Sequence, residues 1–223
     1  MTGTKTLQVH RQGTTRYSYV DDLRFHNNTL ILTDAGNPAL ILVDLRNGEQ
    51  QRVLSHRQCV TDERPMCAEG QILMTGNHEA RVHADQLEVS PDGQILYFQP
   101  SSGPMWKVAT EDLENTSLTD AQLNARVKFF YDTPTTGGTA IDGDGNLYVS
   151  DVDKLRILKI TPDGQAATFI ADPRLVWADA MWITASGSLW IPAIQLNRTA
   201  TFQRDGVFRA SNCPSASTQL TLT

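Results

Sequence analysis

Three aspartates occupy matching places in the sequence, each two residues ahead of the residue that opens a short apolar stretch. They are Asp21 in "YVDDLRF", Asp85 in "HADQLEV" and Asp179 in "VWADAMWI". Converging carboxylates repel one another unless a cation or protons neutralise them. Carboxylate oxygens are the ligands that a hard cation such as Ca²⁺ takes in proteins. We therefore predict a divalent-cation site at these three residues, with Asp85 and Asp179 also as catalytic candidates.

Each of these aspartates has a second interpretation, in which it caps its own turn by accepting backbone N–H groups. Aspartate does this readily where a strand begins, so both interpretations stay open for each residue taken alone. Capping explains the three residues together less well. Asp22 adjoins Asp21 and would point to the opposite face of an extended segment, which makes Asp22 the weaker candidate.

Two histidines precede Asp85 in "GNHEARVHADQ". A histidine beside carboxylates can act as a general base or a metal ligand, so His83 is a further catalytic candidate. His78 is a candidate for binding a ligand at the same place. The plainer alternative for both histidines is a solvated loop.

Aromatic and amide side chains could complete a binding site. Trp177 and Trp182 flank Asp179, and tryptophan can stack on a sugar or an aromatic ligand. We expect Trp182 to pack between sheets and take Trp177 as the ligand-binding candidate, with packing as its alternative. Asn197 and Arg198 in "QLNR" follow a late strand and are also ligand-binding candidates. The chain carries no phosphate loop, zinc motif or G-x-S-x-G nucleophile.

The elements that must position these residues are short strands rich in apolar, β-branched and aromatic residues. Turn clusters such as "SPDG", "DGDG" and "TPDG" separate them. The strands are expected at 29–36, 39–45, 94–100, 146–151, 155–160, 167–172 and 188–193. Only 109–126 looks partly helical, with Ser117 or Thr119 as its cap.

The strands recur as four units with the same order, roughly 40–65 residues apart, and this pattern is typical of propeller blades. The units open with "DDLRF", "DQLEV", "GGTAI" and "DAMWI". A β-sandwich is the alternative, but it does not require the same order of strands and glycine turns in each unit. The first strand of a blade lines the central channel, so Asp21, Asp85, Gly137 and Asp179 are expected at one channel mouth.

The predicted fold is all-β, a six-bladed β-propeller type with about four blades present and therefore an incomplete ring. We assign residues 1–208 to this partial propeller. Residues 209–223 form a Ser/Thr-rich tail that does not resemble a closing strand and could be disordered. An open ring exposes sheet edges and apolar flanks, so we expect self-association of this chain.

Composition narrows the possible partners. The 223 residues are 40% apolar and 20% charged, with a net charge of −6, which argues against nucleic-acid binding. No apolar run approaches the roughly 20 residues that span a membrane, and the N-terminus lacks the apolar core of a signal peptide. Cys59, Cys67 and Cys213 show no metal spacing, and both a Cys59–Cys67 disulfide and free thiols stay open.

The quoted units, with "LILTDAGNPALILVDLRNGEQQRVL" and "AIDGDGNLYVSDVDKLRILKI", resemble the major royal jelly protein/yellow family, including its bacterial and fungal members. The likeness covers about residues 17–199. More distantly the units resemble the gluconolactonase/regucalcin propellers, in which a Glu, two Asn and an Asp hold a divalent cation that helps to open a sugar lactone. The resemblance implies six blades, so this sequence is expected to be a partial chain. It also implies a secreted or periplasmic protein.

Function is expected first as binding of a small organic molecule at the channel mouth. The alternative is a divalent-metal-dependent lactone hydrolase. Yellow-like proteins are also linked to dopachrome conversion, which no residue here specifies, and a further alternative is a non-catalytic scaffold. The gluconolactonase set does not transfer whole, because this sequence has Asp where that set has Asn and shows no counterpart of its Glu.

Overall fold

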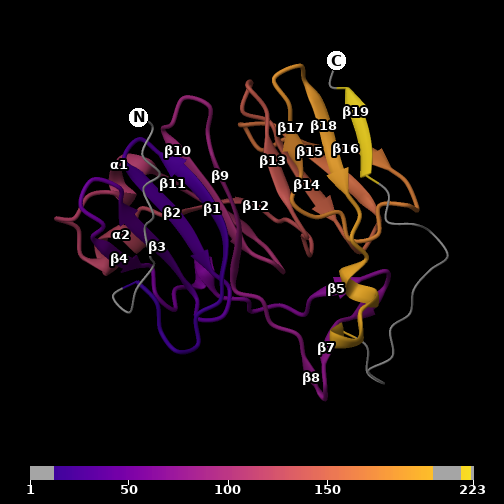
Figure 1. Ribbon diagram of the computed structural model, residues 1–223, viewed down its shortest axis with the longest axis horizontal. Coiled ribbons are helices and arrows are strands. Elements are labelled where there is room, and N and C mark those ends of the chain that lie inside the picture. The colour runs from indigo at the N-terminus through magenta and orange to yellow at the C-terminus, as the bar shows by residue number, and fades with distance from the viewer. Residues whose placement is uncertain (1–12, 203–216, 222–223) are drawn as a thin grey trace, which may run out of the picture.

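The structure, a computed structural model, describes residues 13–202 and 217–221. Its strands form four antiparallel sheets that follow one another along the chain, three with four strands and one with three (Figure 1). Two short two-stranded hairpins accompany them. The described part of the chain is therefore all-β, as the repeats predict.

Each sheet is built from consecutive strands. The first contains β1 (Val20–His26), β2 (Thr29–Asp34), β3 (Ala39–Asp44) and β4 (Gln50–Val53). The second contains β9 (Ala84–Val89), β10 (Ile95–Pro100), β11 (Met105–Ala109) and β12 (Lys128–Tyr131). The third contains β13 (Thr139–Ile141), β14 (Leu147–Asp151), β15 (Arg156–Ile160) and β16 (Ala166–Ala171). The fourth contains β17 (Trp182–Ile183), β18 (Ser188–Pro192) and β19 (Ser217–Thr221).

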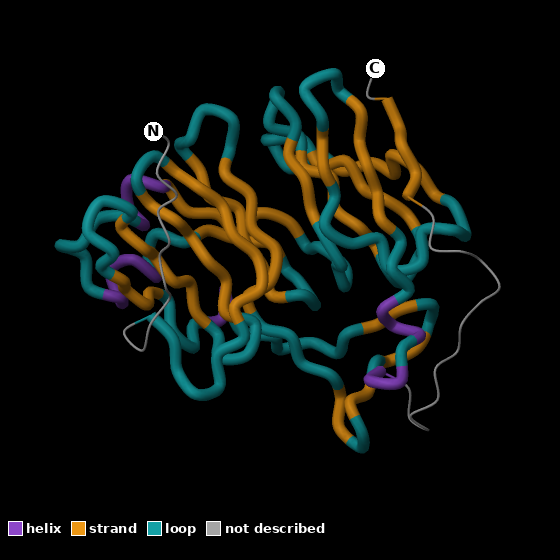
Figure 2. Tube along the Cα trace, viewed as in Figure 1, coloured by secondary structure: helices purple, strands orange, loops and turns teal. Residues whose placement is uncertain are grey.

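The remaining elements are short and lie between the sheets. The link from the first to the second sheet contains η1 (Gln58–Val60), β5 (Cys67–Ala68), β6 (Gln71–Ile72), β7 (Met74–Thr75) and β8 (His78–Glu79). The other helical turns are α1 (Thr110–Leu113), α2 (Asp120–Asn124), η2 (Leu196–Arg198) and η3 (Ala200–Phe202). Figure 2 shows how few they are. Among the described residues, no helix is long and apolar enough to cross a bilayer.

The first strands of successive sheets are neighbours, as a propeller requires. Strand β1 contacts β9, β9 contacts β13, and β13 contacts β17. Each sheet then extends away from these inner strands, so the described sheets form an arc around a common axis (Figure 1). The arc places the beginnings of all four inner strands near one another.

Alternation along the strands builds the cores between the sheets. Successive residues of a strand point to opposite faces, so β10 sends Leu96 and Phe98 toward the first sheet and Tyr97 toward the third. Leu96 and Phe98 pack with Ile31 of β2, whereas Tyr97 packs with Leu147 of β14. A further cluster of buried apolar residues joins the third and fourth sheets. Both faces of the middle sheets are therefore buried.

The partly helical segment 109–126 contains two short helices that pack on this core. Thr119 caps α2, because its side chain accepts a hydrogen bond from the backbone N–H of Gln122, and Gln122 reciprocates. Of the two cap candidates it is thus Thr119 that fills the role. Leu113 and Leu123 are buried in the cluster between the first two sheets.

The tail contributes a strand. Residues 217–221 form β19, which pairs with β18 from Ser188↔Thr221 to Pro192↔Ser217. The expectation that residues 209–223 lack a closing strand is therefore wrong for 217–221. Pairing supplies partners to the outer edge of β18, and this gain outweighs the weak strand pattern of the tail. Residues 209–216 and 222–223 lie outside the described residues.

Two of the cysteines are free thiols in the structure. Cys59 is buried within η1 and Cys67 is partly exposed in β5. Burial raises the pKa of Cys59 to about 12, so this thiol is protonated at neutral pH and chemically inert. Cys213 lies outside the described residues.

Residues 62–82, here called the strap, belong to the link between the first and second sheets and reach across to the end of the fourth. Buried apolar residues of the strap share one cluster with residues of the third and fourth sheets; the cluster contains Met66, Ala68, Leu73, Ala80, Val152 and Trp177. In Figure 1 the strap strands β5 and β7 lie beside the helical turns that follow β18. The strap therefore ties distant parts of the arc together.

Candidate functional site

A cavity of about 870 Å³ runs along the four inner strands and includes the places where they begin. Asp21, Asp85, Gly137 and Asp179, the four positions predicted for the channel mouth, all line it. Each comes from a different sheet, so only the propeller arrangement brings them together. The predicted row of residues is thus one wall of a single cavity.

Asp21 and Asp85 form a hydrogen-bonded carboxyl pair. Burial raises the pKa of Asp85 well above its usual range, and the hydrogen bond and charge of Asp21 raise it further. The charge of Asp179 acts in the same direction. Two carboxyls this close repel each other when both are ionised, and this repulsion favours the protonated form of Asp85.

Asp179 is held at both oxygens. Its Oδ1 accepts a hydrogen bond from the backbone N–H of Ala180 (2.8 Å), and its Oδ2 accepts one from the Trp177 indole (3.1 Å). Burial raises the pKa of Asp179, while these two hydrogen bonds lower it. Asp179 therefore does cap its own turn, as the alternative interpretation held, and it also lines the cavity.

A chain of buried polar side chains stands behind Asp85. The Gln86 amide donates to Asp85 Oδ2 (2.7 Å) and to the Thr136 carbonyl (2.9 Å). Gln99 donates to Gln86 Oε1 (3.2 Å), and the Thr133 hydroxyl donates to Gln99 Oε1 (2.9 Å). Sequence reasoning missed this chain, although a glutamine within the apolar run "ILYFQP" is a signal that could have found it.

An ion pair that sequence reasoning also missed lines the cavity farther along the inner strands. Arg24 of β1 donates two hydrogen bonds to Glu88 of β9 (2.9 and 2.7 Å) and one to Asp22 (2.7 Å). Glu88 is almost fully buried and accepts a further bond from the Thr139 hydroxyl (3.0 Å). Three sheets are joined by this network, so it fixes the spacing of the cavity wall.

Asp22 lines the same cavity as Asp21. The register of β1 against β2 shifts between Val20 and Leu23, which marks a bulge. A bulge adds a residue to one strand and lets two consecutive side chains point the same way. Burial raises the pKa of Asp22, and the charge of Arg24 works against that rise.

Packing explains why the third blade has a glycine in the row. A Cβ at Gly137 would lie 2.5 Å from the carbonyl oxygen of Ala178 and 3.0 Å from the Trp177 indole nitrogen. A Cβ at Gly138 would lie 2.5 Å from the backbone carbon of Asp179. The third and fourth sheets approach each other so closely here that no larger residue fits.

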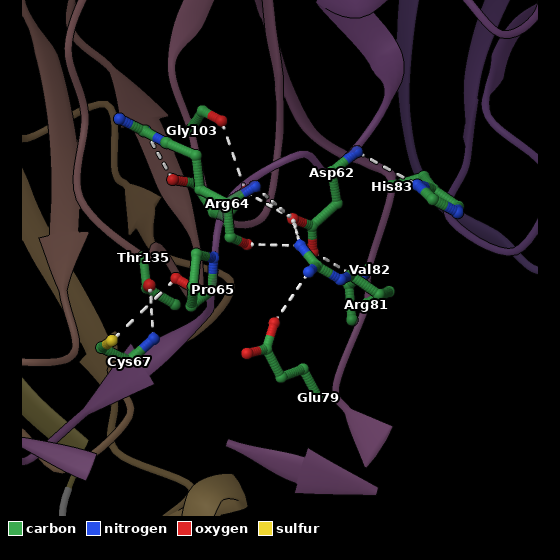
Figure 3. Close-up of polar contacts among 11 residues, drawn as sticks. Asp62, Arg64, Pro65, Cys67, Glu79, Arg81, Val82, His83, Gly103 and Thr135 are labelled. Carbon is green, nitrogen blue, oxygen red and sulfur yellow. Dashed lines mark hydrogen bonds and ion pairs between the residues drawn. The ribbon is translucent and has the colours of Figure 1, made fainter. Parts of the chain in front are cut away.

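The two histidines do not join this cavity wall. His83 Nδ1 accepts a hydrogen bond from the backbone N–H of Asp62 (3.1 Å), at the beginning of the strap (Figure 3). Burial lowers the pKa of His83, so the ring is neutral near pH 7. His78 is exposed in β8, on the strap. Neither histidine is among the residues that line the cavity.

The two tryptophans have roles opposite to those expected. Trp177 is 3% exposed and its ring stacks on Phe202, with 6.0 Å between centroids. Trp182 is 68% exposed and lines the cavity. The reason is strand alternation, because Met181 and Ile183 pack toward the third sheet and Trp182 must point the other way.

Asn197 and Arg198 bind the strap, and they are not among the residues that line the cavity. Arg198 donates to both oxygens of Glu69 (3.0 and 2.6 Å), and the Asn197 amide donates to Glu69 Oε2 (2.8 Å). These bonds fasten the tip of the strap to the turn that follows β18. Asn197 and Arg198 therefore hold two distant segments of the chain together.

The three aspartates share a cavity without forming a ready-made metal site. Within the described ranges, no group of three or more His, Cys, Asp or Glu side chains is arranged to hold a metal ion. The donors of Asp21, Asp85 and Asp179 therefore do not fit a preassembled divalent-cation site as they stand.

Solved structures with a similar fold are propellers or proteins of comparable architecture. A β-propeller domain from Myceliophteria thermophila matches with a TM-score of 0.52 at 9% identity, covering 80% of this chain and 52% of that one. A gluconolactonase from Xanthomonas campestris matches with a TM-score of 0.57 at 19% identity, covering 83% and 57%. At these identities the likeness establishes the β-propeller fold alone.

A catalytically inactive virginiamycin B lyase from Staphylococcus aureus, solved with quinupristin, gives a TM-score of 0.54 at 12% identity and covers 97% of this chain and 58% of that one. This chain thus spans a little over half the length of these solved proteins. No curated protein matches the sequence. The sequence pattern of the major royal jelly protein family matches residues 8–212. The chain belongs to the major royal jelly protein family.

Proposed function

We propose that this chain forms a small-molecule-binding site at the mouth of the propeller channel. One observation carries the proposal: inner strands of separate sheets bring Asp21, Asp85 and Asp179 to one cavity of about 870 Å³. Pockets for small organic ligands are roughly 300–1,000 Å³, and they combine apolar walls with a few polar groups that orient the ligand. The cavity has this composition.

The lining favours a ligand with a ring and a positively charged or hydroxyl-bearing end. The Arg24 charge is already neutralised by Glu88 and Asp22, so the aspartates at the mouth leave the wall acidic. An acidic wall attracts cations and hydrogen-bond donors. Apolar side chains offer a surface for the rest of the molecule; they are Leu23, Phe25 and Trp182.

A matched pair of probes tests the proposal. Phenethylamine and phenylacetate share a ring and differ in charge, and Trp182 in the cavity wall provides a fluorescence signal. We expect phenethylamine to bind, with about tenfold weaker affinity in Asp179→Asn, since a charged hydrogen bond contributes roughly 1.5–3 kcal/mol. Asp163→Asn removes an exposed charge far from the mouth and serves as the control. Equal binding of both probes, or binding unchanged in Asp179→Asn, would contradict the proposal.

A divalent-cation-dependent lactone hydrolase is the second candidate. The closeness of Asp21 and Asp85 favours it, because a hard cation can neutralise carboxylates that otherwise repel each other. Ca²⁺ should then raise the melting temperature, with the shift lost in Asp85→Asn, and glucono-1,5-lactone should be hydrolysed. Turnover that persists in both Asp85→Ala and Asp179→Ala would rule out this site. A non-catalytic scaffold would show neither binding nor turnover.

A further inference from the structure

Trp177 combines a buried ring with an unusual backbone. Its φ is +50°, a left-handed conformation that is rare and strained for bulky residues. Such a residue persists only where its surroundings hold it. The Trp177 carbonyl accepts a hydrogen bond from the Ile194 N–H (3.1 Å), which fixes the backbone against the end of β18. This conformation aims the indole N–H at Asp179 Oδ2 (3.1 Å).

The ring of Trp177 is held largely by the strap. Its buried neighbours in the cluster come mostly from the strap; those four are Met66, Ala68, Leu73 and Ala80. On its other side the ring stacks on Phe202, with 23° between the planes. The strap therefore encloses a side chain whose only polar atom contacts a cavity residue.

The strap is fastened at its tip and at its base. At the tip, Arg198 pairs with Glu69 (2.6 Å) and the Gly70 N–H donates to Asp153 (2.8 Å). At the base, the carboxylate of Asp62 is fully buried and accepts a hydrogen bond from the Val82 N–H (3.0 Å). Figure 3 shows Asp62 and Val82 facing each other, so the two ends of the strap are joined.

We infer that Trp177 is a positioning residue for the channel site, and that the strap holds it in place. The Ala180 N–H fixes one oxygen of Asp179 and the indole fixes the other, so the carboxyl has a single orientation toward the cavity. The inference rests on the proposed function, since orientation matters only if Asp179 contacts a ligand. It extends the site to residues that never touch the cavity.

The experiment must separate positioning from ordinary core packing. Trp177→Phe keeps an aromatic ring in the cluster and removes the N–H. Trp106→Phe is the matched control, because the Trp106 indole nitrogen is buried and has no hydrogen-bond partner. The readout is the pKa of Asp179 in ligand-free protein, followed by carboxyl ¹³C NMR and assigned with Asp179→Asn.

We expect Trp177→Phe to raise the pKa of Asp179, because a bond that stabilises the ionised form is lost. Phenethylamine affinity should fall about fivefold, and Trp106→Phe should change neither quantity. An Asp179 titration unchanged in Trp177→Phe overturns the inference, as does a shifted titration with unchanged affinity. If no variant binds phenethylamine, the proposed function fails while the titration still decides how Asp179 is held.

A second variant keeps the inference testable if Trp177→Phe does not fold. Arg198→Gln loosens the tip of the strap without touching the ring, and Arg46→Gln removes an exposed arginine from a local pair with Asp44. We expect Arg198→Gln to raise the pKa of Asp179 in the same direction, and Arg46→Gln to leave it unchanged. An Asp179 titration that does not respond to Arg198→Gln contradicts the role of the strap.

Discussion

Two kinds of buried carboxyl occur in this protein, and their surroundings differ. Asp34, at the end of β2, is fully buried, and its oxygens receive hydrogen bonds from Arg52 (2.7 Å) and the backbone N–H groups of Tyr19 (3.0 Å) and Asn37 (2.9 Å). Burial acts to raise the pKa of Asp34, but hydrogen bonds from Ser18, Arg52 and these N–H groups leave it lowered. Asp85 faces another carboxyl, and its pKa is raised.

The comparison separates structural carboxylates from the candidate site. Donors of fixed position stabilise an ionised Asp34, which clamps one blade. Asp85 lies beside Asp21 inside a cavity, and a strongly raised pKa of this kind is a common mark of functional sites. Sequence patterns alone place both kinds of aspartate beside strands, so their surroundings are the distinguishing feature.

The largest expected effect comes from removing a structural carboxylate. Asp34→Asn leaves the mostly buried Arg52 without its ion partner, and breaking such a pair costs about 3 kcal/mol. Denaturant unfolding measures this loss. Asp163→Asn, an exposed turn residue, should change stability little. Equal losses in both variants would contradict the distinction drawn between the two kinds of carboxyl.

The next effect concerns the glycine in the row of mouth residues. Gly137→Ala places a Cβ 2.5 Å from the Ala178 carbonyl, so we expect a loss of about 2 kcal/mol from overpacking. Gly143→Ala is the control, because nothing lies within 4 Å of a Cβ there. If Gly137→Ala unfolds at the same denaturant concentration as Gly143→Ala, close packing does not explain the missing fourth carboxylate.

The stability contributions of Asp34 and Asp85 should change with pH in opposite directions. Asp34 has a lowered pKa, so its contribution is present above the ordinary value of 3.8 and is lost as the pH falls through the lowered pKa. The contribution of Asp85 to folding stability is present below pH 3.8, the ordinary pKa, and is lost as the pH rises through its raised pKa. Asp85→Asn should therefore gain in melting temperature relative to wild type toward neutral pH.

The same melting curves provide the opposite outcome for Asp34. The deficit of Asp34→Asn should be greatest at neutral pH and shrink in acid. Melting temperatures between pH 3 and pH 8 show both trends. Parallel curves for the two variants would contradict the opposite directions of the Asp34 and Asp85 pKa shifts.

The smallest effect on folding is expected at the apolar side chains of the fourth sheet. Trp182 and Trp190 are directly paired across β17 and β18 and are 68% and 39% exposed. We propose that they contribute to self-association. Trp182→Ser should change stability by less than about 0.5 kcal/mol but reduce association, measured by light scattering over a range of concentrations. A wild-type chain that stays monomeric throughout would contradict this proposal.

The repeat and the row of mouth residues could be predicted because both depend on local order along the chain. The turn, the first strand and the acid before it recur at the same spacing, so aligning units also aligns positions in space. Asp22 could not be placed this way, because a bulge in β1 changes the side to which a residue points. The exposure of Trp182 was likewise not predicted, because it depends on how side chains alternate between the two faces of β17.

The path of the strap was beyond sequence reasoning for a different reason. His83 is near Asp85 in the chain, yet the strap turns its ring toward Asp62. Asn197 and Arg198 meet Glu69, which is more than a hundred residues earlier. Contacts between residues so far apart in the sequence depend on how whole sheets pack. A local sequence pattern does not predict them.

The hydrogen bonds in the polar chain behind Asp85 all run in one direction from donor to acceptor, toward Asp85. The Thr133 hydroxyl must donate to the Gln99 carbonyl oxygen, which turns the Gln99 amide nitrogen toward Gln86. Gln86 in turn offers its nitrogen to Asp85 Oδ2. That oxygen is thereby a hydrogen-bond acceptor. A threonine just beyond β12 thus orients, through two amides, the N–H group that a distant acid accepts.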